Sequence, residues 1–385
     1  MELIKLNHDE GRPDLMRVGV RAGIRGLAIT ASNYVGTIQF RSGRTVEILP
    51  KIGKDVGHRA SREIFLRMLE EVMELDFKES GPSHIDTSRM PILEVFITRF
   101  IGYVQDVVRK GLASAYYDVE SNERFLRGSV VFQQDIVLNA AHRERFYVSY
   151  QTYGLDRPEN RLLKTALNLL YGLSRNSRNR RDIHSLLCHF DVLPSSTDIE
   201  SDIDKISLDR NMRYYARALK WARIFLSKKS FNVFSGKEVS FAILFPMDEL
   251  YERYVFSTLC RSIKGLKPVY QEQSFLFRDE NGRRRVKIKP DIIVKDGSRC
   301  VAIIDTKWKR IFDEGDVDQS DIYQMFVYSA RYQCQNAILV YPRVSDVSFR
   351  YSSDSIDMVL RNFNYNLEKP NLDALLAMVK ESSGS

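Results

Sequence analysis

An apolar β-hairpin that ends in two aspartates is the feature that most constrains this chain. Ile292-Ile293-Val294 and Val301-Ala302-Ile303-Ile304 are short apolar runs on either side of an Asp296-Gly297 turn, which is the pattern of two antiparallel strands. Asp291 stands just before the first run and Asp305 just after the second. Because the pairing brings both ends to one edge, we expect the two carboxylates to converge. A buried carboxylate costs free energy unless it has a partner or a task.

Lys307 adds a cation to this predicted pair. It stands two residues beyond Asp305 and therefore points to the same face of the strand. Two carboxylates form an oxygen site suited to Mg²⁺, with the backbone carbonyl of Thr306 as a further ligand. The metal would polarise a phosphodiester and lower the pKa of a bound water, and Lys307 would hold that water and offset charge on the transition state. We predict that Asp291, Asp305 and Lys307 are catalytic.

Two predicted helices border this hairpin. The preceding helix carries Glu249 and Glu252, three residues apart and so on one face. We prefer Glu252 as a further metal contact, and a pair of solvated glutamates is the alternative. In the following helix Gln324 and Tyr328 share a face at a spacing of four and are predicted to shape the site. A helix that simply packs on the sheet through Tyr328 is the alternative there.

The arrangement of Asp291, Asp305 and Lys307 resembles the PD-(D/E)xK nuclease motif, and Gln324-x-x-x-Tyr328 resembles the QxxxY element of RecB-like nucleases. Longer strings resemble the McrC family and spread over most of residues 30–345. They are Ser32–Gly36, Glu47–Gly53, Leu126–Gly128, Glu159–Lys164, Phe245–Val255, Ile303–Trp308 and Tyr323–Met325.

The resemblance implies a function. The McrC family supplies the nuclease subunit of McrBC-type, modification-dependent (type IV) restriction systems. Its partner is an McrB-like AAA+ NTPase hexamer, which hydrolyses GTP or ATP and recognises modified cytosine. The McrC-like subunit docks through its N-terminal region, stimulates the NTPase and cuts double-stranded DNA with Mg²⁺. A non-cleaving cap on an AAA+ ring and a motor-independent nuclease are the alternatives.

The sequence carries no motor of its own. Ser235-Gly236-Lys237 lacks the upstream glycine of a phosphate-binding loop and is followed by Glu238. No apolar run approaches the roughly 20 residues of a membrane span, so no membrane partner is expected. The four cysteines form no C-x-x-C pair, as expected of a protein in a reducing compartment. We therefore predict a cytoplasmic location.

The pattern of elements predicts an α+β fold. A mixed β/α region, residues 1–235, precedes an α/β nuclease domain, residues 240–385, whose central mixed sheet is flanked by helices. The first region subdivides near 115–125, and 227–240 is the linker. Strands are expected over 16–50 and 126–150 in the first region, and over 269–277, 284–294, 300–306, 337–341 and 358–363 in the second. Helices are expected over 59–77, 90–112, 158–173, 211–226, 247–263, 317–332 and 372–379.

The charge is mildly basic, with 58 Lys+Arg against 50 Asp+Glu and a net charge of +8. Residues 1–240 hold most of the excess. There the segment Ser174–Arg181, with four arginines, is predicted to be a loop that touches phosphates or is merely solvated. The strands at 34–49 are a candidate docking surface for the motor, and a core sheet is the alternative. Near the predicted site, DNA contacts are expected from Arg283, Arg284, Arg285, Lys287 and Lys289.

Overall fold

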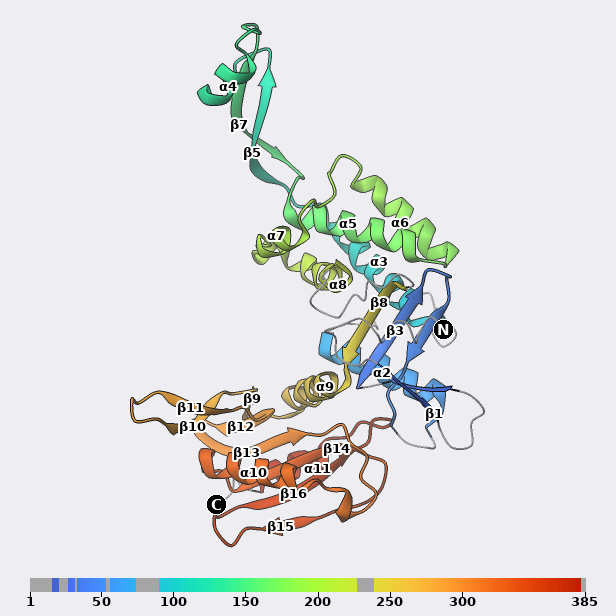
Figure 1. Cartoon of the computed structure of the whole chain (residues 1–385), viewed down its shortest axis with the longest axis vertical. Helices are drawn as coiled ribbons and strands as arrows, with labels where there is room; N and C mark the ends of the chain where they lie inside the picture. The colour runs from blue at the N-terminus through green and yellow to red at the C-terminus, as the bar shows by residue number, and fades with distance from the viewer. Residues whose placement is uncertain are drawn as a thin grey trace. The chain divides into compact units, whose positions relative to one another are not determined.

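A computed structural model describes residues 16–20, 27–31, 33–52, 56–73, 90–226 and 239–381 (Figure 1). The chain divides into two compact units. The first, here called the sheet unit, comprises residues 1–37, 46–83 and 244–385, and the second, the helical unit, comprises 38–45 and 84–243. The predicted domain boundary at 235–240 stays a prediction, and residues 227–238 of the predicted linker lie outside the described part.

A mixed six-stranded sheet forms the centre of the sheet unit. Its order is β15-β16-β14-β13-β12-β9. The hairpin β12–β13 is antiparallel, and β13 runs parallel to β14, which runs parallel to β16. The bounds are β9 Lys267–Tyr270, β12 Ile292–Asp296, β13 Arg299–Thr306, β14 Asn336–Pro342, β15 Arg350–Ser352 and β16 Val359–Tyr365.

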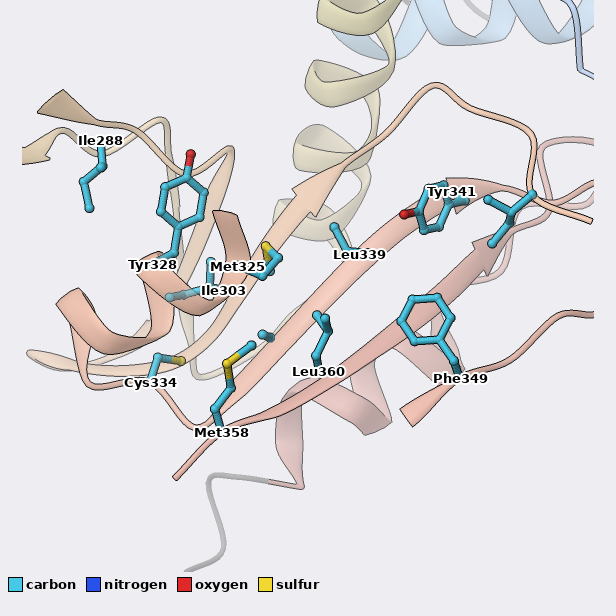
Figure 2. Close-up of a cluster of buried hydrophobic side chains, with 12 residues drawn as sticks. Ile288, Ile303, Met325, Tyr328, Cys334, Leu339, Tyr341, Phe349, Met358 and Leu360 are labelled. Carbon is cyan, nitrogen blue, oxygen red and sulfur yellow. The ribbon is translucent and has the colours of Figure 1, made fainter. Parts of the chain in front are cut away.

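Helices cover this sheet because the middle residues of its central strands are apolar, as in Val301–Ile304 of β13 and Ala337–Val340 of β14. Every residue of β14 is buried, as expected of a strand with both faces covered. Helix α10 (Gln319–Tyr332) packs on β13 and β14, while α9 (Met247–Ser262) and α11 (Asp373–Lys380) pack on β13. Figure 2 shows the cluster under α10, where Met325 and Tyr328 meet sheet residues such as Ile303, Leu339 and Leu360.

Helix α2 (His58–Met73) joins the sheet unit although it precedes the sheet by almost two hundred residues. It packs against α9. The ring of Phe65 meets that of Phe245 with centroids 6.0 Å apart, and Ser257 Oγ donates to Glu71 Oε1 over 2.7 Å. Arg67 Nη1 donates to the carbonyl oxygen of Leu367 over 3.0 Å.

Two smaller sheets confirm the strands expected over 16–50. Strands β1 (Met16–Val20) and β2 (Leu27–Ala31) form an antiparallel pair. Strands β4 (Thr45–Ile48), β3 (Tyr34–Phe40) and β8 (Val239–Pro246) form a three-stranded sheet in that order.

The helical unit has a core of interlocked aromatic side chains. Its helices are α3 (Ile92–Lys110), α5 (Pro158–Leu173), α6 (Ser177–His189), α7 (Ile199–Asp204) and α8 (Ala216–Leu226), with the 3₁₀ helix η1 (Arg210–Tyr215) before α8. Rings of α3 and α8 meet at the centre: Phe96 lies 5.3 Å from Trp221 and Phe100 lies 5.5 Å from Phe225, centroid to centroid. No helix in the described part of the chain is long and apolar enough to cross a membrane.

A long β-hairpin, here called the arm (residues 115–154), extends from the helices of its own unit (Figure 1). Strands β5 (Ala115–Glu123) and β7 (Phe146–Gly154) pair along nine residues, and β6 (Ser129–Val130) and α4 (Phe132–Leu138) lie between them in sequence. Gly128 has φ of +68°, and a Cβ there would lie 2.3 Å from the carbonyl oxygen of Ser149. Only glycine fits that position.

Four local predictions need correction. Residues 126–150 contain the expected strands at Ser129–Val130 and Phe146–Gly154, but Phe132–Leu138 form α4 between them, and β5 was not predicted. Ser174–Arg181 is not a loop throughout, because α6 begins at Ser177. The runs 269–277 and 284–294 each split into two strands, giving β9 with β10 (Ser274–Arg278) and β11 (Arg284–Ile288) with β12. The short strand β15 was also not predicted. The α+β class with a mixed sheet flanked by helices is confirmed.

Candidate active site

The β12–β13 hairpin brings Asp291 and Asp305 together, as its sequence predicts. Ile292 pairs with Ile304, so the two aspartates stand opposite each other one residue beyond that pair, on the same face of the sheet. Asp291 Oδ2 accepts hydrogen bonds from the Thr306 N–H at 2.7 Å and from Thr306 Oγ1 at 2.8 Å. Thr306 therefore fixes the orientation of Asp291 through two donors that sequence reasoning did not assign.

Lys307 joins the sheet to helix α10. Its Nζ lies 2.8 Å from Asp305 Oδ2 and 3.2 Å from Asp321 Oδ1, and it donates to Gln324 Oε1 over 2.8 Å. Asp321 is buried, and its other oxygen accepts from Lys309 Nζ over 3.0 Å. The ammonium of Lys307 is thus held by three oxygen atoms from two elements.

Gln324 and Tyr328 continue this network. Gln324 Nε2 donates to the Tyr328 hydroxyl over 2.7 Å, and that hydroxyl donates to the carbonyl oxygen of Lys289 over 3.4 Å. Figure 2 shows the ring of Tyr328 inside the apolar cluster, with its hydroxyl pointing away from Met325 and Ile303. The ring of Tyr328 therefore packs on the sheet while its hydroxyl reaches the polar network, and its role in shaping a catalytic site stays a prediction.

The two aspartates are electrostatically strained. Burial and the negative charge of Asp291 raise the pKa of Asp305, Lys307 opposes them, and the net result is a pKa of about 7. Burial also raises the pKa of Asp291, against the hydrogen bonds from Thr306. Within the described residues Asp305 Oδ2 accepts no hydrogen bond of suitable geometry, and the ammonium of Lys307 faces it as an ion pair. Two close carboxylates of this kind mark a site that a cation would stabilise.

Lys307 stays cationic in this setting. Burial lowers its pKa, but the carboxylates of Asp305 and Asp321 outweigh burial, so the pKa of Lys307 is raised overall. A charged ammonium fixed beside two carboxylates suits the stabilisation of developing negative charge better than it suits proton abstraction.

Of the two glutamates on α9, Glu252 faces the site. It is buried, and burial, with repulsion from Asp291, raises its pKa to about 7. Its Oε1 accepts from Gln271 Nε2 over 2.7 Å, and Gln271 Oε1 accepts from Lys289 Nζ over 3.0 Å. Glu249 is instead half-exposed and pairs with Arg253 at 2.8 Å.

A third acidic ligand is not assembled in this arrangement. In the described ranges, no group of three or more His, Cys, Asp and Glu side chains is placed to hold a metal ion. The role of Glu252 in metal binding and that of the Thr306 backbone carbonyl stay predictions. The donors already in place are the two aspartate side chains.

The predicted DNA contacts lie on a second hairpin, formed by β10 and β11. Arg283, Arg284, Arg285 and Lys287 are exposed there, and Lys289 follows β11. Arg285 pairs with Asp279 at 2.7 Å, and the guanidinium of Arg284 lies 5.6 Å from the ring centroid of Phe275. Through Gln271, Lys289 connects this hairpin to Glu252.

Asp321 and Gln271 are the network residues that the motifs missed. Asp321 closes the acidic run after residue 312 and stands three residues before Gln324, a spacing that places both on one helix face. That spacing was available as a signal. Gln271 offered none, because its position depends on a backbone φ of +47° between β9 and β10.

Comparison with known proteins gives one solved structure of the same fold. The chain matches, with a TM-score of 0.63 and 19% identity, a chain of the structure described as a refined half-complex from a tetradecameric assembly of Thermococcus gammatolerans McrB AAA+ hexamers with bound McrC. The match covers 95% of this chain and 84% of the other. A second structure, of the Thermococcus gammatolerans McrBC complex, matches at 18% identity and a TM-score of 0.44 over 66% of this chain and 74% of that one.

The curated proteins contain no match to the chain. The sequence pattern of one family does match it: the family described as McrBC 5-methylcytosine restriction system component, over residues 29–342. That match covers well over half of the chain and includes the β12–β13 hairpin and most of the sheet unit's central strands. The chain therefore belongs to the family of McrBC 5-methylcytosine restriction system components.

Proposed function

We propose that this chain is the Mg²⁺-dependent DNA endonuclease subunit of an McrBC-like restriction complex, with Asp291, Asp305 and Lys307 as its catalytic residues. The observation that carries the proposal is the meeting of two strained carboxylates and one ammonium at the end of the central sheet. Family membership supports a role in restriction and a modified-cytosine DNA substrate.

The residues at this point fit a divalent metal. Oxygen donors are the ligands that Mg²⁺ prefers, and the buried carboxylate of Asp305 lies opposite that of Asp291 with the Lys307 ammonium 2.8 Å from its Oδ2. Asp291 and Asp305 would hold the ion, with the Thr306 carbonyl and Glu252 as further contacts. When bound, Mg²⁺ would polarise the scissile phosphate and lower the pKa of a coordinated water.

The protein's own groups have separate tasks in this scheme. Thr306 holds Asp291 in position through its N–H and hydroxyl. Lys307 offsets the charge that builds up on the phosphate oxygens, and Asp321 and Gln324 hold its ammonium in place. Tyr328 keeps Gln324 oriented.

DNA would reach the site along the β10–β11 hairpin. Its exposed cations, Arg283, Arg284, Arg285, Lys287 and Lys289, suit contact with phosphates, which dominate protein–DNA affinity. The link from Lys289 through Gln271 to Glu252 joins that surface to the aspartates.

The arm supplies the surface for a motor partner. It exposes large apolar side chains at 53–76% of their area: Tyr116, Phe125, Leu126, Phe132, Ile136, Val137, Leu138 and Tyr153. Apolar exposure on this scale marks an interaction surface. We propose that the arm binds an McrB-like AAA+ NTPase hexamer and that this contact stimulates the NTPase.

In the predicted docking strands at 34–49, Val35, Ile38 and Phe40 are buried, which favours the alternative of a core sheet there.

DNA cleavage with the partner, its nucleotide and Mg²⁺ tests the catalytic assignment. Asp305→Ala and Lys307→Ala should abolish cleavage while partner binding persists. Asp354→Ala, which removes an exposed carboxylate of the same unit, is the matched control and should cut normally. Cleavage by Asp305→Ala or Lys307→Ala at the wild-type rate would sink the assignment. NTPase stimulation without cleavage by the unaltered chain would instead identify a non-cleaving cap.

Partner binding tests the arm. The double variant Phe132→Ser, Val137→Ser removes two exposed apolar side chains and should weaken binding to the AAA+ ring at least about tenfold, since burying such side chains contributes roughly 1.5–3 kcal/mol each. Val192→Ser is the control, because Val192 is 82% exposed but lies outside the arm. Equal affinities for both variants would exclude the arm as the docking surface. Cleavage by the unaltered chain without a motor would identify a motor-independent nuclease.

A further inference from the structure

We infer that the helical unit carries a second surface for the DNA backbone, here called the arginine surface. It consists of Arg41 and Arg44 on the turn between β3 and β4 and of Arg175, Arg178 and Arg181 at the start of α6. The inference rests on the proposed function, since it assigns further contacts to the same DNA substrate. It concerns residues that belong neither to the β10–β11 hairpin nor to the site at Asp291 and Asp305.

The two parts of this surface are in contact. Gly43, at the tip of the turn, has φ of +85°, and a Cβ at that position would lie 3.6 Å from Arg175 Nη2. The guanidinium of Arg175 therefore lies against the turn that carries Arg41 and Arg44. Segments more than 130 residues apart in the sequence thus contribute cations to one place.

The segment that carries the α6 arginines is held in place by hydrogen bonds to a buried carboxylate of α3. Glu94 of α3 is buried, and its carboxylate accepts four hydrogen bonds from uncharged donors: Ser174 Oγ at 2.8 Å, the N–H groups of Arg175 and Asn176 at 2.6 and 3.1 Å, and Asn179 Nδ2 at 2.8 Å. Asn176 caps the helix by accepting from the N–H groups of Arg178 and Asn179. The arginines are displayed on a fixed scaffold, which lowers the ordering cost of binding.

The cations of this surface have little internal compensation. All five arginines are exposed. Arg178 approaches Asp182 only at 4.0 Å, and the side chains of the other four make no ion pair or hydrogen bond with the described residues. Like charges that outnumber their acidic neighbours repel one another, and a polyanion relieves that repulsion.

The composition around the arginines favours nucleic acid over protein. A protein interface has an apolar core, but no large apolar side chain is exposed among the described residues 41–45 and 171–189. Beside Arg181, a groove of about 390 Å³ is lined by Tyr171 and Arg180 as well as by Ser177, His184 and Ser185. Guanidinium groups match phosphate oxygens in a two-point geometry, so duplex DNA is the partner that this surface fits.

Arg180 is excluded from the arginine surface. Its guanidinium stacks on the ring of Tyr171 with 4.3 Å to the centroid, and its Nη1 donates to the Tyr171 carbonyl oxygen over 2.8 Å. It holds α5 to α6 and is left intact in the test.

The test measures duplex DNA binding by fluorescence anisotropy across a salt series, with the full chain bound to its motor and without Mg²⁺. The triple variant Arg44→Gln, Arg178→Gln, Arg181→Gln is compared with Lys205→Gln, Arg210→Gln, Arg213→Gln, which removes the same charge from exposed positions of the same unit. The slope of log affinity against log salt falls by about 0.9 for each phosphate that the protein no longer neutralises. We expect the first variant to lower the slope by about 2–3 and the control to leave it unchanged.

Two outcomes overturn the inference. Equal slopes for the two variants remove the arginine surface from DNA binding. Unchanged DNA binding with weaker motor binding assigns the surface to a protein. If the melting temperature falls only in the triple variant and circular dichroism shows unfolded chain, the measurement is repeated with the single variants Arg178→Gln and Arg181→Gln. Each single variant is expected to lower the slope by about 0.9. Failure of the proposed function is separate, because it appears as intact cleavage in Asp305→Ala.

Discussion

Glu94 and Asp305 are both buried carboxylates, yet their surroundings differ. Glu94, in the helical unit, receives four hydrogen bonds from uncharged donors that belong to one short segment. Asp305, in the sheet unit, stands opposite a second carboxylate, has a pKa raised to about 7, and keeps one oxygen without a hydrogen bond among the described residues. The first arrangement stabilises a fold, whereas the second retains free energy that a bound cation would recover. Burial alone does not distinguish a structural carboxylate from a candidate catalytic one. The hydrogen-bond donors around each carboxylate do distinguish them.

The largest expected effect is on cleavage. Asp305→Asn removes one of the two charges that we propose bind the metal, and it should lower the cleavage rate about 1000-fold or more, which corresponds to about 4 kcal/mol of activation free energy. Glu94→Gln should leave the rate of the folded complex within about twofold, because its contacts lie in the other unit. The comparison breaks if Asp305→Asn cuts DNA at a rate similar to that of Glu94→Gln.

The next largest effect is on the free energy of unfolding, where Glu94→Gln should have the larger effect of the two variants. Glu94→Gln keeps one acceptor oxygen where the wild-type carboxylate has two charged ones. It should therefore lower the free energy of unfolding by roughly 2–3 kcal/mol. Asp305→Asn should leave it unchanged or raise it, because Lys307 keeps Asp321 as a partner while a buried charge disappears. Chemical denaturation without Mg²⁺ measures both, and a larger loss in Asp305→Asn would contradict the distinction.

Magnesium should distinguish the two carboxylates by stabilisation. At a Mg²⁺ concentration tenfold above its Kd, the wild type should gain about 1.4 kcal/mol of unfolding free energy, because the ion binds only the folded chain. Glu94→Gln should gain the same unfolding free energy from Mg²⁺, although its stability without the ion is lower. Asp305→Asn should gain none. Calcium and a chelator serve as controls in the same thermal melts, and an unchanged gain in Asp305→Asn would place the ion elsewhere.

The last prediction concerns the pH dependence of stability without metal. The Asp305 carboxyl releases its proton near its ordinary pKa of 3.8 when the chain is unfolded, but only near 7 when it is folded. The folded state therefore binds more protons in that window, and the carboxyl lowers the free energy of unfolding as pH rises from about 4 to 7. Wild type should lose stability relative to Asp305→Asn over this range. A constant difference between the two proteins would show that the folded carboxyl titrates normally.

The central part of the site was predictable because a local hairpin builds it. The turn at Asp296-Gly297 and the apolar runs on either side set the register, and the register alone places Asp291 opposite Asp305. Lys307 follows from strand alternation. Asp321 joins only through the packing of α10 on β13 and β14, which no local pattern encodes.

Where the fold departed from prediction, tertiary contacts prevailed over local preference. Ser174–Arg181 is rich in residues that favour turns, but Glu94 and Asn176 supply the hydrogen bonds that let α6 begin at Ser177. The strand run 269–277 breaks at Gln271, whose N–H donates to the carbonyl oxygen of Asp291. Strand β5 was missed because it alternates half-buried with exposed polar and aromatic residues and lacks an apolar run.

The interrupted sequence of the sheet unit has a consequence for biosynthesis. Helix α2 buries its apolar face against α9, which the ribosome delivers almost two hundred residues later. Most of the helical unit, residues 84–243, is continuous and is complete before α9 begins. Because domains generally fold as units during synthesis, the helical unit can form first. Until α9 is synthesised, α2 lacks its packing partner and Phe65 lacks its contact with Phe245. The six-stranded sheet is therefore the last part of the chain to mature, and Asp291 and Asp305 meet only when translation is nearly finished.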